Sequence, residues 1–279
     1  MTQSKTPTTA HGPGFRFQWR VSLPLAIALC VVVDAFFIEP NWIQVTHSAV
    51  RAPVTAPLKI AHLTDIHTNV MGHRERRLIE LLNQEKPDII LITGDSINRG
   101  RGTYDAVHSL YQQLHAPLGV WFVHGNWEDW HPVRHEQAFY GSAGIHLLVN
   151  ASAHPRQDFW LIGLDDSTTG HPNFSAATKD VPPGALTIAL FHSPAAFHHL
   201  AGRVSLALAG HTHGGQVRIP FVRPFWLPVG SGGYLAGWYE EKESRLYVSR
   251  GLGMTYASVR FLCRPELAFI TLVPESGGH

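Results

Sequence analysis

The sequence holds 19 histidines among 279 residues, and several stand beside Asp, Asn and Gly in short spaced motifs. Imidazole is the commonest metal ligand among side chains and also an acid or base near neutral pH. Together with carboxylate and amide oxygens, it suits Mn, Fe, Zn, Ni or Co. These residue types predict a metal centre, so the first question is which of the histidines form it.

Five motifs that contain metal-ligating residue types occur in a fixed order, each directly after an apolar run. A carboxylate shared by two ions can hold them about 3.5–4 Å apart, the separation that in-line attack on phosphorus requires. The motifs therefore indicate a two-metal centre for phosphoester chemistry. They are Asp65-Ile66-His67, Gly94-Asp95, Gly125-Asn126-Trp127-Glu128, His192, and Gly210-His211-Thr212-His213.

The apolar runs before these motifs predict strands, and most of them alternate with amphipathic stretches that predict helices. Such alternation indicates an α/β fold with parallel strands, whose carboxyl ends line a common crevice. The later strands predict a second sheet. Strands are expected at 58–65, 88–95, 117–126, 146–150, 159–165, 187–191, 205–209, 234–240, 245–249 and 266–273, and helices at 73–86, 103–114, 131–143 and 194–200.

The ordered motifs resemble the calcineurin-like metallophosphoesterase family, whose pattern is D-x-H, G-D, G-N-H-[DE], a lone His and G-H-x-H. The resemblance extends over most of residues 58–273. The stretches GHTHGGQVRIP (210–220) and LYVSRGLG (246–253) resemble the membrane-associated bacterial branch of that family. The resemblance implies an α/β, four-layered α/β/β/α sandwich with its site at the sheet edges.

The same resemblance implies a ligand set and a reaction. A metal-bridging hydroxide would attack a phosphodiester or pyrophosphate bond without forming a phosphoenzyme. The cofactors would be two divalent ions, with manganese expected first and Fe, Zn, Ni, Co or Mg as alternatives. Asp65, His67 and His213 would hold the first metal, Asp95 would bridge both, and Asn126, His192 and His211 would complete the second.

One residue departs from the family pattern, because Trp127 stands where the third motif usually has a histidine. Indole offers only an N–H donor. His124 or His131 could replace the missing imidazole, the leaving group could need little protonation, or turnover could be slow, since general acid catalysis contributes about 10²–10⁴-fold. Arg99 could lie over the phosphate, because its guanidinium fork matches phosphate oxygens. The expected catalytic residues are Asn126, Asp95, His124 and Arg99.

The segment 221–229 follows the histidine pair and holds three large aromatic residues and two prolines. One interpretation is a loop packed beneath the second sheet. The other is an apolar lip beside the metals that grips an acyl chain or enters a membrane. On the second interpretation Phe225 and Trp226, together with Trp127, contact the substrate.

The N-terminal region has a different composition from the rest of the chain. Residues 1–20 read as a polar leader, and residues 21–38 as a transmembrane or anchor segment that Pro24 and Asp34 interrupt. A signal peptide and a buried helix are the alternatives. Residues 39–57 are expected to form a linker or an edge extension, and 58–274 the catalytic domain. The basic flank before the segment places the N-terminus in the cytoplasm and the domain outside.

Composition narrows the possible partners. The net charge is only +1, so no specific nucleic-acid binding is expected. We expect a monomer at the cell membrane that acts on a lipid-linked substrate. The alternatives are the UDP-2,3-diacylglucosamine pyrophosphatase of lipid A synthesis, which needs the cytoplasmic leaflet, a general extracytoplasmic phosphodiesterase for nucleotides or phospholipids, and a metal-binding scaffold without turnover.

Overall fold

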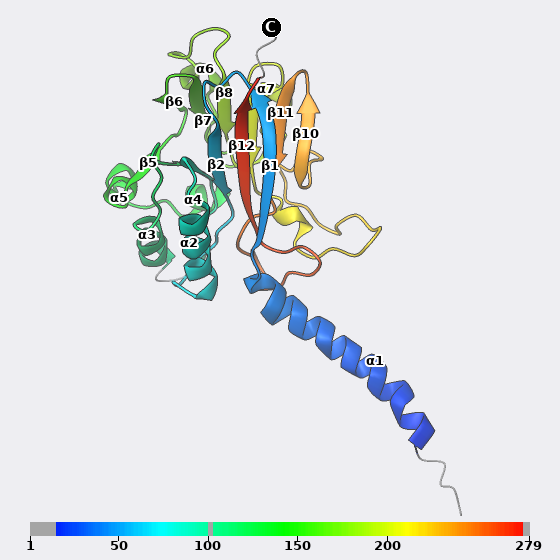
Figure 1. The fold of residues 1–279 in the computed structure, drawn as a ribbon. Coiled ribbons are helices and arrows are strands. Elements are labelled where there is room, and N and C mark those ends of the chain that lie inside the picture. The colour runs from blue at the N-terminus through cyan, green and yellow to red at the C-terminus, as the bar shows by residue number, and fades with distance from the viewer. Residues whose placement is uncertain (1–14, 100–102, 276–279) are drawn as a thin grey trace, which may run out of the picture.

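The computed structural model describes residues 15–99 and 103–275, which form two six-stranded sheets and a projecting N-terminal helix (Figure 1). The first sheet has the order β1-β12-β2-β3-β4-β5, and the second has the order β10-β11-β9-β8-β7-β6. The strands are β1 Gln44–Ala52, β2 Leu58–Leu63, β3 Ile89–Thr93, β4 Val120–Val123, β5 Ile145–Leu147, β6 Ala151–Arg156, β7 Phe159–Gly163, β8 Thr187–Leu190, β9 Leu206–Ala209, β10 Gly237–Glu241, β11 Ser244–Val248 and β12 Glu266–Pro274.

Helices cover the outer face of each sheet, so the domain has four layers. Apolar residues of α2, α3 and α5 pack on the first sheet, and those of α6 and α7 pack on the second. A third apolar cluster lies between the sheets. This arrangement is the predicted α/β/β/α sandwich. The helices are α2 His73–Glu85, α3 Thr103–Tyr111, α4 Asn126–Trp130, α5 Glu136–Ser142, α6 Phe174–Ala177 and α7 Phe197–Leu200.

Strand β3 shows why continuous apolar runs form the inner strands. Successive side chains of a strand point to opposite faces. Ile89 and Leu91 belong to the cluster between the sheets, whereas Ile90 and Ile92 pack against the helical layer. All four are fully buried, and each contributes about 1.5–3 kcal/mol relative to an exposed position. A polar residue at any of these positions would face one core or the other.

Parallel pairing brings the motif-bearing loops together. β2, β3 and β4 are parallel neighbours in the first sheet, as are β7, β8 and β9 in the second. The loops that follow β2, β3, β8 and β9 meet at one edge of the sandwich, as the contacts described below show. The predicted site therefore lies where two sheet edges come together.

The structure decides between two expectations for residues 39–57, corrects one strand boundary and adds one strand. Residues 44–52 form the edge extension and not the linker, because β1 pairs in parallel with β12 along its whole length, from Gln44 opposite Glu266 to Ala52 opposite Pro274. β1 is an edge strand with only two buried residues, so its apolar signal in the sequence is weak. The strand expected at 117–126 ends at Val123, and Asn126 instead begins α4. β6 has no buried residue and was absent from the prediction for the same reason.

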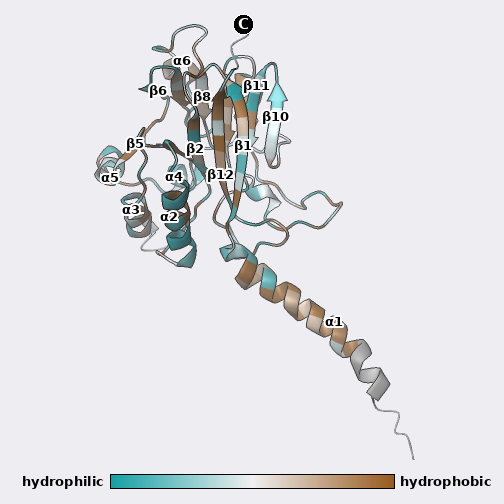
Figure 2. Ribbon diagram, viewed as in Figure 1, coloured by the Kyte–Doolittle hydropathy of each residue, from teal (hydrophilic) through white to brown (hydrophobic). Residues whose placement is uncertain are grey.

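The N-terminal helix α1 spans Phe15–Val33 and continues through a π-helical turn, Asp34–Ile38, and a 3-10 turn, Glu39–Asn41. It starts before the predicted boundary at residue 21, and residues 1–14 of the predicted leader lie outside the described residues. The helix leaves the domain at one end, and from Val21 onward it exposes apolar side chains (Figure 2). Within the span Val21–Asn41, an 18-residue window has mean hydropathy 2.5 and is 6% buried, so the span could be a membrane anchor or a signal sequence.

Candidate metal centre

Two groups of potential ligand atoms lie at the joined sheet edges. Asp65, His67 and His213 form one group, and Asp65, Asp95 and His192 form the other. Within each group the ligand atoms lie within 4.8 Å of one another, and all five residues are buried. They come from the loops after β2, β3, β8 and β9, so four segments distant in sequence build one site.

Asp95 stands between the two groups. One oxygen, Oδ1, accepts the backbone N–H of Trp127 at 2.9 Å. The other, Oδ2, lies 3.2 Å from His192 Nε2 and 3.5 Å from His67 Nε2. Because one oxygen is held by the backbone, the second is aimed between two imidazoles, as expected of a bridging ligand.

Asp65 is held in a similar way on the opposite side of the site. Its carboxylate accepts the backbone N–H of His211 at 2.9 Å. Its Oδ1 lies 3.2 Å from His213 Nε2 and 3.9 Å from His192 Nε2. The backbone of the second sheet therefore orients a carboxylate that belongs to the first.

Backbone carbonyls fix the tautomers of two imidazoles. His67 Nδ1 lies 2.9 Å from the carbonyl of Ile97, and His192 Nδ1 lies 2.7 Å from that of Thr93. A carbonyl only accepts, so each Nδ1 carries the hydrogen. The Nε2 atoms are buried and have no hydrogen-bond partner among the described residues. Each Nε2 lies close to a carboxylate oxygen, and a cation can sit between the two atoms, so this arrangement fits a bound metal.

Among the candidate ligands, two further buried atoms lack a hydrogen-bond partner within the described part of the chain, namely Asn126 Oδ1 and His213 Nδ1. His211 differs from the other ligand candidates, because its Nε2 donates to the Val229 carbonyl at 2.7 Å and it belongs to neither group of close donors. Its ring lies 4.8 Å from that of His192. The bond to Val229 leaves the Nδ1 lone pair of His211 as its only free ligand atom.

Burial and the neighbouring charges shift the pKa values of these side chains in opposite directions. Burial lowers the pKa of His67 to about 4, although Asp95 opposes it, so this imidazole is neutral near pH 7. Burial also lowers the pKa of His192, but Asp95 and Asp65 raise it well above the usual value. Burial raises the pKa of Asp65, and the surrounding imidazoles lower it far more. The Asp65 carboxylate is therefore ionised near pH 7.

Backbone strain concentrates at the same loops. Five of the seven candidate ligands, Asp65, His67, Asp95, His211 and His213, have positive φ between 44° and 72°. Non-glycine residues rarely adopt this region, and such strain clusters at functional sites. Glycine is also required here, because a Cβ on Gly125 would lie 2.3 Å from Asp95 Oδ1.

Glu128 has a positioning role that the motif pattern alone did not reveal. Its buried carboxylate accepts the backbone N–H groups of Asp95 at 2.8 Å, Ser96 at 2.9 Å and Gly125 at 2.9 Å. It therefore ties the loop after β3 to the start of α4. Burial, together with the charge of Asp95, raises the pKa of Glu128 to about 7. The acidic position that ends the third motif was the available signal.

Trp127 lies beside the ligands instead of pointing away from them. Its ring makes an edge contact with that of His67, with centroids 5.2 Å apart. The Arg99 guanidinium lies over the indole, 5.6 Å from its centroid. The departure from the family pattern therefore brings an arginine next to the site by a cation–π contact.

His124 does not line the cavity beside the metal ligands. Its Nδ1 lies 3.7 Å from Asp129 Oδ1 and 3.6 Å from Asp165 Oδ1, and its Nε2 pairs with Glu136. Burial lowers the pKa of His124, but hydrogen bonds to Asp165 and Glu136 raise it to about 10. The His124 imidazole is thus surrounded by carboxylates, and it is protonated at neutral pH.

A cavity of about 310 Å³ opens beside the ligands and is lined by Asp95, Asn126, Trp127, His211 and His213. Trp226 and Tyr256 form another part of its wall and contact each other edge to face, 5.8 Å apart. Phe225 is 81% exposed and Trp226 55% exposed. The segment 221–229 is therefore an exposed lip and is not packed beneath the second sheet.

The comparisons with known proteins agree with the geometry. Residues 58–215 match the family described as calcineurin-like phosphoesterase, and the chain belongs to this family. It is 31% identical over 261 residues to the metallophosphoesterase YkuE of Bacillus subtilis, covering 85% of this chain and 88% of that protein. It is 30% identical over 251 residues to the phosphodiesterase YaeI of Escherichia coli, covering 85% and 91% respectively.

Among solved structures, the putative 5′-nucleotidase of Staphylococcus aureus in complex with alpha-ketoglutarate has a TM-score of 0.48 at 10% identity. The alignment covers 80% of this chain and 56% of that chain. Similarity at this level carries no information about substrate. Family membership and the two ligand groups define the protein as a metal-dependent phosphoester hydrolase with two mixed sheets.

Proposed function

We propose that the chain is a two-metal phosphodiesterase or pyrophosphatase that acts on a lipid-linked substrate. The observation that carries the metal assignment is geometric: the buried Nε2 atoms of His67 and His192 have no hydrogen-bond partner among the described residues and lie 3.5 Å and 3.2 Å from the same oxygen of Asp95. Asp65, His67 and His213 would hold the first ion, Asp95 would be shared by both ions, and Asn126, His192 and His211 would hold the second.

Two bound divalent cations supply an activated water and neutralise charge on the phosphoryl oxygens. Other residues of the chain hold the ligand side chains in place. Glu128 and the Trp127 N–H hold Asp95 in its bridging orientation, and the Ile97 and Thr93 carbonyls hold the two imidazoles in the ligating tautomer. Manganese is the proposed native metal, because the donor set mixes carboxylate and amide oxygens with imidazole.

Arg99 is the proposed phosphate contact. It is exposed, lies on the face of Trp127 and belongs to the loop that follows Asp95. A guanidinium there can bind equatorial phosphoryl oxygens as charge develops on them. His124 points into a carboxylate cluster. We therefore assign it a positioning role in the loop after β4 in place of the catalytic role expected from the sequence.

The lipid-linked substrate rests on two features of the structure. The exposed Phe225 and Trp226 stand beside the metal cavity, where they can contact an acyl chain. The apolar span Val21–Asn41 can hold the site near a bilayer. The phosphodiesterase name of the E. coli relative supports a diester as the bond that is cleaved.

The test is metal content and turnover of a chromogenic phosphodiester by the full chain in detergent with Mn²⁺. Wild type should bind about two metals and turn the diester over. Asp95→Ala should lose turnover by about 10³-fold or more, together with at least one metal, because the bridge is removed. Asp180→Ala, at an exposed carboxylate, is the matched control and should behave as wild type.

Two results would count against the proposal. Retained activity in Asp95→Ala would refute the assignment of the bridging ligand. Two bound metals without turnover of diesters, monoesters or pyrophosphates would favour a metal-binding scaffold.

A further inference from the structure

We propose that the end of the molecule that carries the metal centre is a membrane-facing surface, which seats the catalytic domain on the bilayer entered by α1. The inference rests on the proposed function only for its statement that the substrate is lipid-linked. The surface consists of three segments, residues 34–42, 217–229 and 254–264. Its occupant is the lipid bilayer interface.

Each of the three segments exposes large apolar side chains, an unusual concentration for a soluble surface. The loop 217–229 is the most exposed, with Phe221 fully exposed, Phe225 81% and Val229 89%. The other two segments contribute Trp42 at 53% and Tyr256 at 72%. The exposed apolar residues of these segments are Phe36, Phe37, Ile38, Trp42, Ile219, Phe221, Val222, Phe225, Trp226, Val229, Tyr256 and Leu262.

The base of α1 is bonded directly to the segment 254–264. The buried Glu39 carboxylate accepts the backbone N–H groups of Leu262, at 2.7 Å, and Cys263. The N–H of Arg260 donates to the Ala35 carbonyl at 3.0 Å. The Arg264 guanidinium stacks on the Trp42 ring, 3.7 Å from its centroid. The helix therefore cannot pivot freely relative to this loop.

A buried arginine makes the same loop rigid. The Arg260 side chain is fully buried, and its guanidinium donates to the carbonyls of Gly251, Gly253 and Cys263 at 2.7–3.1 Å. Its backbone neighbour Phe261 accepts from Arg218 N at 2.8 Å and donates to the Gln216 carbonyl at 3.1 Å. The second and third segments are thus joined to each other as well as to the helix.

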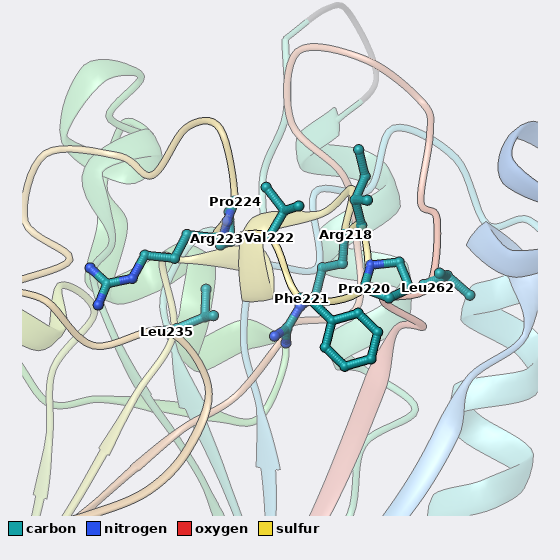
Figure 3. A pocket seen from close by; sticks show the side chains of 9 residues that line it. Arg218, Pro220, Phe221, Val222, Arg223, Pro224, Leu235 and Leu262 are labelled. Atoms are coloured by element: carbon teal, nitrogen blue, oxygen red, sulfur yellow. The ribbon is translucent and has the colours of Figure 1, made fainter.

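The apolar surface continues from the helix base to the metal cavity. A cavity of about 430 Å³ is lined by Leu262 on one side and by Phe221 and Val222 on the other (Figure 3). Farther along the loop, Trp226 and Val229 line the metal cavity together with Tyr256. A lipid phosphate at the depth of these aromatic residues would lie next to the proposed ligands.

The charge of this surface matches a bilayer better than a protein partner. The segments 217–229 and 254–264 contain no Asp or Glu, and they hold three arginines that are not buried, at 218, 223 and 264. The segment 34–42 adds Asp34 and the buried Glu39. Neither Arg218 nor Arg223 forms an ion pair with any described carboxylate. Cationic side chains beside exposed aromatic residues are typical of surfaces that contact anionic headgroups. The opposite end of the domain carries Glu240, Glu241 and Glu243 on the β10–β11 hairpin and has no comparable apolar cluster among the residues in view.

The test measures the depth of the loop in a bilayer and uses the full chain. Val222→Cys, in a Cys30→Ser background, is labelled with an environment-sensitive NBD dye; Cys263 is buried and stays in place. Lys179→Cys is the matched control, because Lys179 is exposed and follows α6 at the opposite end. Both proteins are reconstituted into vesicles of equal parts phosphatidylcholine and phosphatidylglycerol, with doxyl-labelled lipid as quencher.

We expect a blue-shifted dye at 222 that is quenched about two-fold or more, as for a residue within the interface, and an unquenched dye at 179. Absence of quenching at 222, or equal quenching at both positions, would overturn the proposal. The quenching requires no turnover. A failure of the proposed function, seen as no turnover of the soluble diester by the metal-loaded chain, is therefore distinguishable from a failure of the membrane-facing surface.

A second measurement links the surface to catalysis. The double variant Phe221→Ser/Val222→Ser changes only residues of the exposed loop tip. It should reduce turnover of phospholipid in vesicles about ten-fold, because fewer apolar contacts hold the domain at the interface, and it should leave turnover of the soluble diester unchanged. Unchanged turnover of both substrates would contradict the proposal.

Discussion

At the residue scale, the orientation of the imidazoles defines this site more sharply than their number. The Nδ1 atoms of His67 and His192 are both committed to backbone carbonyls, so each Nε2 is left to face Asp95. A carbonyl suits this purpose because it only accepts hydrogen bonds. The Thr93 carbonyl ends β3 and the Ile97 carbonyl lies in the loop that follows, so the end of this strand and its loop fix the tautomers of both histidines.

The family histidine that Trp127 replaces offers a direct test. Trp127→His should raise the rate for an alkyl diester relative to a p-nitrophenyl diester, by about 10²-fold at most, since only the poor leaving group needs a proton. The measurement is kcat for the two substrates at the same metal load. An unchanged ratio would indicate that protonation of the leaving group does not limit turnover.

The proposed phosphate contact of Arg99 can be tested separately. Arg99→Met removes the guanidinium but keeps an unbranched side chain against the Trp127 ring. We expect kcat/KM to fall about 10–100-fold, because a charge-assisted contact to phosphate is lost, while metal content stays at the wild-type value. A fall in metal content would show instead that Arg99 supports the fold of the ligand loops.

At the element scale, the loops that carry the ligands are held in place by hydrogen bonds to other elements more than by contacts within each loop. Glu128 connects α4 to the loop after β3, and the N–H of His211 connects the second sheet to Asp65. Away from the site, Asp158 in the β6–β7 turn accepts from Thr55 N at 2.7 Å and pairs with Arg156 Nε at 2.6 Å. This carboxylate fastens the end of β1 to the second sheet.

The lowered pKa of Asp158 predicts that the free energy of unfolding depends on pH. Partial burial raises the pKa of Asp158, but Arg156 and Thr55 lower it further, to about 2, from an ordinary value of 3.8. The ionised form is therefore favoured by folding, and its contribution is complete above pH 4 and lost as pH falls through about 2. Asp158→Asn should cost about 1–3 kcal/mol of unfolding free energy at neutral pH.

Urea denaturation midpoints of both proteins, measured from neutral to acid pH, check this prediction. The difference between wild type and variant should shrink as the pH falls through the interval between 4 and 2. A difference that stays constant over that interval would show that the carboxylate charge contributes nothing.

At the scale of the whole molecule, α1 and the end of β12 lie at opposite ends of the sandwich (Figure 1). The metal centre lies at the end from which α1 emerges, because β2, β3, β8 and β9 all point their carboxyl ends that way. An anchor at this position would hold the cavity close to the bilayer, whereas an anchor at the other end would hold it away. We propose a single-pass or anchored membrane protein whose catalytic domain, residues 58–274, is extended by β1, Gln44–Ala52, as the edge strand of its first sheet.

The side of the membrane is open to a simple test. Arg16 and Arg20 precede the apolar span, and no Lys or Arg follows until Arg51, so we expect the N-terminus in the cytoplasm and the domain outside. Alkaline phosphatase fused after His279 should then be active, and a fluorescent protein at the same position dark. The reverse pattern would place the domain at the cytoplasmic leaflet and favour the UDP-2,3-diacylglucosamine pyrophosphatase.

The sequence by itself determined the fold class, the inner strands and the proposed ligands. Buried strands such as 88–95 leave an unbroken apolar run, and each run ends in the residues that chemistry requires. The edge strand β6 was not predicted, and β1 was expected only as the alternative to a linker, because half-exposed strands leave little apolar signal.

Only the tertiary structure decided how the side chains are used. The tertiary structure points His124 at a cluster of carboxylates and places Arg99 over the Trp127 ring. It also gives Glu128 three backbone donors and leaves Phe225 exposed. Each of these contacts joins elements that parallel pairing brings together from distant parts of the chain. Such contacts depend on side-chain direction and burial in three dimensions, which the spacing of residues along one strand or helix does not encode.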